Sequence, residues 1–115
     1  MFAPPTSARI WLYAQPTDMR KSFTGLIGLV KTRLQEIPSS GQYFVFINRR
    51  KTHMKILYFE PSGYCLWMKR LEQGQFNFKG DGLDKQALDA TRLQCLLAGI
   101  EMQKYRQFKR YSRVA

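Results

Sequence analysis

The sequence is short of the side chains that bind metals. It contains a single histidine, His53, and two cysteines, Cys65 and Cys95, neither of which belongs to a C-x-x-C pair. A structural zinc site needs four closely placed Cys or His ligands, which these three scattered residues cannot supply. We therefore expect no metal ion. No other cofactor is expected either, since the sequence also lacks a glycine-rich phosphate loop.

Long apolar runs are also missing. No stretch approaches the roughly 20 consecutive apolar residues that a membrane-spanning helix needs, and residues 1–10 lack the apolar core of a signal peptide. We expect a cytoplasmic protein without membrane contact.

Acidic residues are scarce: Asp and Glu together account for eight of the 115 residues. Two-metal phosphoryl transfer requires carboxylates that converge on ions about 4 Å apart. Here Asp18 and Asp89 stand where helices are expected to begin, and Glu60 and Glu72 border expected turns. No Glu is followed two residues later by Lys, and the Ser and Thr residues have no possible histidine partner other than His53. We therefore expect that the chain is not an enzyme.

Positive charge, by contrast, is abundant. Nineteen Lys and Arg give a formal net charge of +11, whereas a net charge of about 2–8 keeps a small domain soluble. The excess favours a polyanionic partner, and without a membrane segment that partner is expected to be nucleic acid. Because 44% of the residues are apolar, the chain can also bury a core.

Two segments show the periodicity of helices. Apolar residues recur at steps of one, three and four over residues 19–37, with Thr17 as the expected N-cap. A shorter helix is expected over residues 90–98, with Asp89 as its N-cap and Gly99 as its stop.

Aromatic and β-branched residues favour strands in five further segments. The first is residues 10–13. The other four are residues 42–47, 53–59, 64–71 and 75–78, which are joined to one another by short turns. Short turns imply antiparallel pairing. The expected fold class is α+β, with a small antiparallel sheet (a meander of about four strands plus a short N-terminal strand) packed by one long and one short helix. A polar loop is expected over residues 79–85.

A chain of 115 residues suits one domain. We expect a loose leader over residues 1–8, a core over residues 9–101 and a basic C-terminal extension over residues 102–115. That extension is either an arm on nucleic acid or a solvated tail.

Basic residues gather at three places where phosphates could be bound: a turn between two strands with the strand that leaves it, the end of a third strand, and the start of the first helix. The nine candidates are Arg49, Arg50, Lys51, His53, Lys55, Lys69, Arg70, Arg20 and Lys21. Arg and Lys bind phosphates through charge-assisted hydrogen bonds. The alternative at each place is solvated surface charge. The aromatic residues beside Lys69 and Arg70 could stack nucleic-acid bases, but core packing is their commoner role.

Several linked motifs resemble a known family. They are Pro16-Thr17-Asp18-Met19-Arg20-Lys21, Asn48-Arg49-Arg50, Lys55-Ile56-Leu57-Tyr58-Phe59-Glu60, Gly63-Tyr64-Cys65-Leu66-Trp67, Lys69-Arg70-Leu71-Glu72 with Gly74 and Phe76, and Leu96-Leu97-Ala98-Gly99-Ile100. Over residues 10–101, this order and spacing resembles the TnpB-type accessory protein, the second open reading frame of insertion-sequence family sixty-six. The resemblance implies an auxiliary role in DNA transposition beside a separate, larger transposase that carries the catalytic acids.

Three functions are therefore compared. The first is a non-enzymatic accessory factor that binds DNA, at transposon ends or target, through a basic hairpin tip and neighbouring cations. The second is an adaptor that docks on the transposase through Tyr64, Trp67 and Phe78, if these are exposed. The third is a small metal-dependent nuclease.

Overall fold

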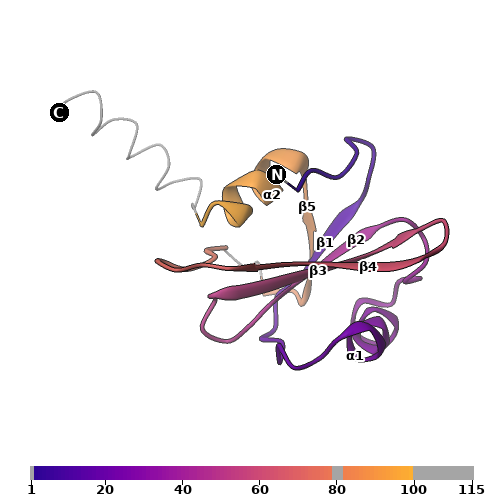
Figure 1. The fold of residues 1–115 in the computed structure, drawn as a ribbon, viewed down its shortest axis with the longest axis horizontal. Coiled ribbons are helices and arrows are strands. Elements are labelled where there is room, and N and C mark those ends of the chain that lie inside the picture. The colour runs from indigo at the N-terminus through magenta and orange to yellow at the C-terminus, as the bar shows by residue number, and fades with distance from the viewer. Residues whose placement is uncertain (1, 79–81, 100–115) are drawn as a thin grey trace.

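A computed structural model describes residues 2–78 and 82–99 as a five-stranded sheet with helices on its two faces (Figure 1). The first helix, α1, continues into a π-helical segment, η1. In chain order the elements are β1 (Ile10–Tyr13), α1 (Phe23–Leu29), η1 (Val30–Leu34), β2 (Tyr43–Ile47), β3 (His53–Glu60), β4 (Gly63–Arg70), β5 (Lys85–Leu88) and α2 (Ala90–Leu97). None of the helices described here is long and apolar enough to cross a membrane.

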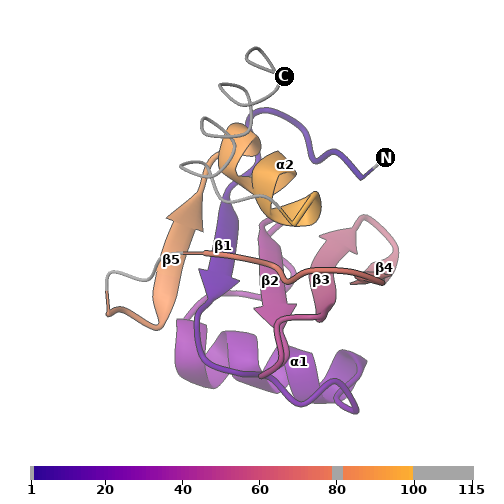
Figure 2. The same ribbon diagram turned by 90° about the vertical axis from the view of Figure 1, so that its left-hand side faces the viewer.

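The strands lie in the order β4-β3-β2-β1-β5, and β5, β1, β2 and β3 can be followed side by side in Figure 2. The hairpins β2–β3 and β3–β4 are antiparallel, as is β1–β5. β1 and β2 are parallel, because the chain between them passes through α1 and η1 before it re-enters the sheet. The α+β class with one longer and one shorter helix is confirmed, while the sheet is mixed and not wholly antiparallel.

The sheet separates two apolar clusters. On one face Leu26, Val30 and Leu34 of the first helix pack on Phe44 and Phe46 of β2. On the other face, α2 packs through Leu93, Leu96 and Leu97 on a cluster that includes Val45 and Ile47. β2 is therefore buried on both sides, which is why its sequence is an almost unbroken apolar run and does not alternate.

The first helix is shorter than its periodicity predicts. It begins at Phe23, after Ser22 as its N-cap, and not beside Thr17. Thr17 instead donates its backbone N–H to Ile47 O at 2.9 Å, and its buried hydroxyl has no hydrogen-bond partner among the described residues. At the other end Gln35 is left-handed, with φ of 54°. Ile37, expected on the buried stripe, is 67% exposed.

The prediction of a strand at residues 75–78 is wrong. That segment is irregular, although its Phe76 side chain is fully buried. The fifth strand instead lies at Lys85–Leu88, and it begins at the last residue of the polar loop predicted over residues 79–85. β5 escapes a pattern search because it is four residues long, lies at the edge of the sheet and carries polar side chains. The second helix is confirmed: Asp89 accepts from Arg92 N at 2.7 Å, and Gly99 has a φ of +73°.

Residues 2–8 run beside the sheet on the α2 side. The Phe2 ring stacks on Trp67 at a centroid distance of 5.0 Å and also contacts Tyr43 and Tyr58. Gln94 of α2 donates to the Phe2 carbonyl at 3.1 Å. The start of the chain therefore covers three half-buried aromatic rings of the sheet.

A polar network fixes β5 to the rest of the sheet. The Lys85 ammonium pairs with the Glu36 carboxylate and lies 4.2 Å from the centroid of the Trp11 ring. Gln42 donates to Glu36 at 2.9 Å and accepts from Trp11 Nε1 at 2.7 Å. The Glu36 carboxylate and its neighbours thus hold together β1, β5 and the loop between η1 and β2.

This network predicts a pH dependence. Hydrogen bonds from Lys85 and then from Gln42 lower the pKa of Glu36 below its usual 4.5. Because the folded chain releases this proton more readily than the unfolded chain, the stabilisation is present above about pH 4.5 and is lost as the pH falls through the lowered value. Replacing Glu36 with Gln should flatten the fall in unfolding free energy on acidification, measured by urea titration at several pH values. The same substitution at Glu72, whose side chain is 78% exposed, serves as control. If the unfolding free energy of both variants falls equally on acidification, the network does not stabilise the fold.

Candidate nucleic-acid interface

The turn between β2 and β3, residues 48–52, is called the tip. Asn48 organises it: Oδ1 of its side chain accepts from Thr52 N at 2.9 Å and from His53 N at 3.0 Å. Lys51 N closes the turn on Asn48 O at 3.0 Å, and Lys51 is left-handed with φ of 60°. Because a side-chain oxygen and backbone groups satisfy each other here, the tip has a defined backbone conformation.

The segment that follows β4 braces the tip from one side. Phe76 N donates to Lys51 O at 2.7 Å, and Gln75 Nε2 donates to Arg50 O at 2.8 Å. Leu71 N donates to Thr52 O at 2.8 Å. Since Phe76 is fully buried, these bonds tie the tip to the core.

Arg49 and Arg50 are exposed at the tip, and Lys51 is half-buried with its ammonium 4.6 Å from the centroid of the Phe78 ring. Three ion pairs occur within the part of the chain that the structure describes, and none includes a tip residue. Three consecutive cations, two of them exposed and one half-buried, therefore lie on a fixed turn without an acidic partner there. An external anion would neutralise this arrangement.

Two further candidates lie next to the tip on the last pair of the β3–β4 ladder, where His53 faces Arg70. Arg70 is exposed and pairs with Glu72 at 2.8 Å, an exposed pair that solvent screens. His53 is half-buried, and its Nδ1 lies 2.8 Å from the Thr52 hydroxyl. Arg70 is thus available to a ligand, whereas the histidine belongs in part to the polar network of the tip.

Lys55 and Lys69 are engaged inside the protein. Lys55 is 6% exposed, and its ammonium donates to Met19 O at 2.8 Å and to Lys21 O at 2.7 Å. Lys69 donates to Leu97 O, at the end of α2, at 2.8 Å. Each ammonium anchors a neighbouring segment through its backbone, and neither is free to meet a phosphate in this conformation.

Lys55 also positions the remaining candidates, Arg20 and Lys21, because it holds the loop that carries them. That loop lies near the tip end of β2, since Thr17 bonds to Ile47, the last residue of the strand. Both side chains are exposed. The Arg20 guanidinium pairs with Asp18 at 2.7 Å and holds the pKa of that carboxyl at about 2, well below its usual 3.8.

The structure therefore brings together seven of the nine predicted residues at one end of the sheet and turns two inward. The basic extension, residues 102–115, lies outside the described residues. Sequence reasoning missed Asn48, Gln75 and Phe76, which shape and brace the tip. An Asn at the first position of a strand-joining turn is a usable signal, because its side chain readily bonds to the backbone a few residues on.

The aromatic residues proposed for an adaptor surface are not gathered on one exposed patch. Tyr64 packs edge-on against Phe59, Trp67 stacks on Phe2, and Phe78 lies beneath Lys51. All three are half-buried. No cluster of three or more His, Cys, Asp or Glu able to hold a metal ion occurs among residues 2–78 and 82–99.

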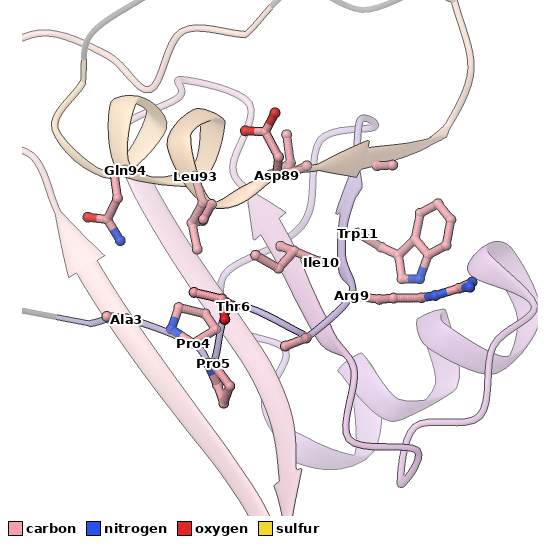
Figure 3. A pocket seen from close by; sticks show the side chains of 14 residues that line it. Ala3, Pro4, Pro5, Thr6, Arg9, Ile10, Trp11, Asp89, Leu93 and Gln94 are labelled. Carbon is pink, nitrogen blue, oxygen red and sulfur yellow. The ribbon is translucent and has the colours of Figure 1, made fainter.

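An open pocket of about 560 Å³ lies elsewhere, between residues 3–11, the end of β5 and the start of α2. Figure 3 shows Ile10 and Leu93 inside it, with Pro4 and Pro5 on one side and Trp11 on another. The lining is mainly apolar, and Arg9 and Asp89 add charged groups. The pocket lies at the end of β1 opposite to the tip, because Ile10 is the first residue of that strand and pairs with the start of β2.

Comparison with known proteins gives a consistent result. The family model described as "IS66 Orf2 like protein" matches residues 8–107. Two proteins of Sinorhizobium fredii are similar over most of their length. The uncharacterized protein y4hO is 33% identical over 95 residues, which is 83% of each chain. The uncharacterized protein y4jC is 31% identical over 117 residues, which covers both chains completely. No solved structure is significantly similar to this chain.

Proposed function

The chain belongs to the IS66 Orf2-like family, and on that premise we propose that it binds duplex DNA through its tip as a non-enzymatic partner of the transposase. Family membership supports an accessory role in the transposition of an insertion sequence. Arg49, Arg50 and Lys51 contact phosphates, and Arg70, Arg20 and Lys21 extend the same basic surface. We expect this binding to be governed by charge, at transposon ends or at target DNA.

The observation that carries this proposal is the arrangement of the three cations on the tip. Its three cations are consecutive, lack an acidic partner among the described residues, and stand on a turn that Asn48, Gln75 and Phe76 fix. A fixed turn loses little conformational entropy when it binds, so the favourable interaction with phosphate is retained in the affinity.

The direct test is to replace Arg49, Arg50 and Lys51 together with Gln. Each phosphate contact contributes about 0.9 to the slope of log affinity against log salt concentration. If all three cations make contacts, the unmodified chain should lose about 40-fold more affinity than the variant between about 50 and 200 mM salt. Fluorescence anisotropy with a labelled duplex of the transposon end measures both slopes.

The matched control removes three exposed cations elsewhere, with Lys31, Arg33 and Arg92 replaced by Gln. Lys31 and Arg33 lie on η1, and Arg92 lies in the first turn of α2. We expect a slope close to that of the unmodified chain. If the two triple variants behave alike, binding depends on net charge alone and the tip has no special role.

Docking on the transposase is a second candidate, and the apolar pocket between the start of the chain and α2 favours it. We propose an apolar segment of the transposase as its occupant, since Ile10, Leu88 and Leu93 supply an apolar lining. Co-purification of the two proteins that survives nuclease and high salt would support direct docking. Loss of the transposase on nuclease treatment would show that DNA joins them.

A further inference from the structure

One edge of the sheet is formed by β4, and that edge is long and unprotected. β4 runs for eight residues, whereas β5 at the opposite edge has four. The register of β4 against β3 is unbroken from Arg70 to Gly63, so the strand has no bulge, and it contains no proline. Proteins blunt an exposed edge strand with such devices or with a projecting lysine. Lys69 does not project along the edge, because its ammonium donates to Leu97 O at 2.8 Å.

The ladder fixes which backbone groups of β4 face outward. Leu71 N donates to Thr52 O at 2.8 Å, one step beyond the pair of His53 with Arg70. Because hydrogen-bonded and non-bonded pairs alternate in an antiparallel ladder, every second residue of β4 turns its N–H and C=O away from β3. These outward residues are Tyr64, Leu66, Met68 and Arg70. Across the described parts of the chain, no other strand or loop bonds to this outer edge.

The same edge carries opposite charges at its two ends. Residues 56–68 contain no Lys or Arg, and their one charged residue is Glu60, which ends β3 beside the turn into β4. Glu60 is exposed and has no ion pair within the described residues. Lys69 and Arg70 lie at the other end of β4. Two such edges placed antiparallel bring the basic end of each beside the acidic end of the other, whereas a parallel arrangement sets like charges together.

We propose that two copies of this chain pair antiparallel through their β4 edges, which joins two five-stranded sheets into one. The two-fold axis passes between Trp67 and its counterpart, because this register alone pairs all four outward residues of each copy. Arg70 then faces Tyr64 of the second copy, and Met68 faces Leu66. The Met68 side chain, 60% exposed in the single chain, is covered by this contact.

This inference goes beyond the proposed function. The contact is self-complementary, since each outward N–H meets a C=O of the same strand in the other copy. Each tip lies beside the Arg70 end of β4, where His53 faces Arg70. Antiparallel pairing therefore places the two tips at opposite ends of the joined edge, and the dimer presents two separate basic surfaces.

Replacing Met68 with Pro tests the pairing. The substitution removes an outward N–H, keeps the bonds between β3 and β4, and replaces an exposed side chain. Met68→Ala is the matched control, since it removes the same side chain and keeps the N–H. The measurement is analytical ultracentrifugation of nucleic-acid-free protein in about 0.15 M salt, which screens the repulsion between two basic chains. We expect the unmodified chain and Met68→Ala to sediment at twice the chain mass of 13.5 kDa, and Met68→Pro at 13.5 kDa.

Amide hydrogen exchange of the unmodified chain tests the register without any variant. The outward amides of Tyr64, Leu66, Met68 and Arg70 should be as protected as the inward amides of the residues between them. In Met68→Pro only the inward amides should stay protected, which also shows that the variant is folded.

A monomer at about 100 μM, well above the Kd of about 1 μM expected for a specific interface, would overturn the inference. Outward amides that exchange rapidly in the unmodified chain at that concentration would do the same. A dimer that Met68→Pro leaves intact would place the contact elsewhere. If the outward amides became protected only when the transposase is added, β4 would accept a strand of that protein, and self-pairing would be wrong.

Discussion

Replacing Phe76 with Ala is expected to lower the unfolding free energy by about 3–5 kcal/mol, the usual cost of truncating a buried aromatic ring. Phe76 is fully buried in the cluster beneath α2, although it lies on an irregular segment and not on a strand. Its backbone N–H donates to Lys51 O. Loss of the ring should therefore also loosen the brace of the tip and weaken DNA binding under conditions where the variant is folded. Urea titration gives the unfolding free energy, and anisotropy gives the affinity.

Phe78 provides the control for this substitution. It is half-buried, and the Lys51 ammonium lies over its ring. Phe78→Ala should cost clearly less, because a smaller apolar area is returned to water. Equal losses for the two variants would mean that Phe76 is not the anchor of the bracing segment.

Lys55→Ala is the second large effect, with an expected loss of about 2–4 kcal/mol in unfolding free energy. The substitution removes a buried aliphatic stem and leaves the carbonyls of Met19 and Lys21 without their donor. Lys55→Met keeps most of the stem and should recover part of the loss. Hydrogen exchange should increase over residues 19–22 in both variants, because that loop loses its anchor.

The Lys55→Met variant also distinguishes an internal role of Lys55 from a phosphate contact. Since its ammonium is engaged by two carbonyls, Lys55→Met should leave the salt slope of DNA binding unchanged under conditions where the variant is folded. A slope that falls by about 0.9, the value of one phosphate contact, with no loss of stability would place Lys55 on the DNA and contradict the internal role.

Local chemistry explains which elements the sequence predicted. Asp89 and Gly99 bound α2 because a capping carboxylate and a left-handed glycine act within one helical turn. The β2–β3–β4 hairpins follow from short turns between apolar runs. Most of the linked motifs behind the family resemblance lie in these same segments, and the match over residues 8–107 confirms the resemblance.

The failures share a different cause, which is contact between distant segments. Residues 19–22 have helical spacing but are held out of the helix by a lysine on β3. β5 forms because β1 offers an open edge and Lys85 meets Glu36 and Trp11. None of these partners is close in sequence, so no local pattern indicates them.

The candidate site shows the same division. Turn chemistry predicts an exposed basic tip at Arg49 and Arg50, and the structure has it. Lys55 lies on the same face of β3 as Leu57, and no local pattern in the sequence shows that α1 covers this face. The brace at Gln75 and Phe76 could not be predicted either, because those residues were expected to form a strand of their own.

The most direct measurement is a backbone amide chemical-shift map of the labelled protein, recorded as duplex DNA is added. Binding through the tip predicts that the largest shifts fall on residues 49–51, with smaller ones at Arg20, Lys21 and Arg70, and none at Lys31 or Arg33. Shifts confined to the pocket residues around Ile10 and Leu93, or an unperturbed tip under saturating DNA, would contradict it.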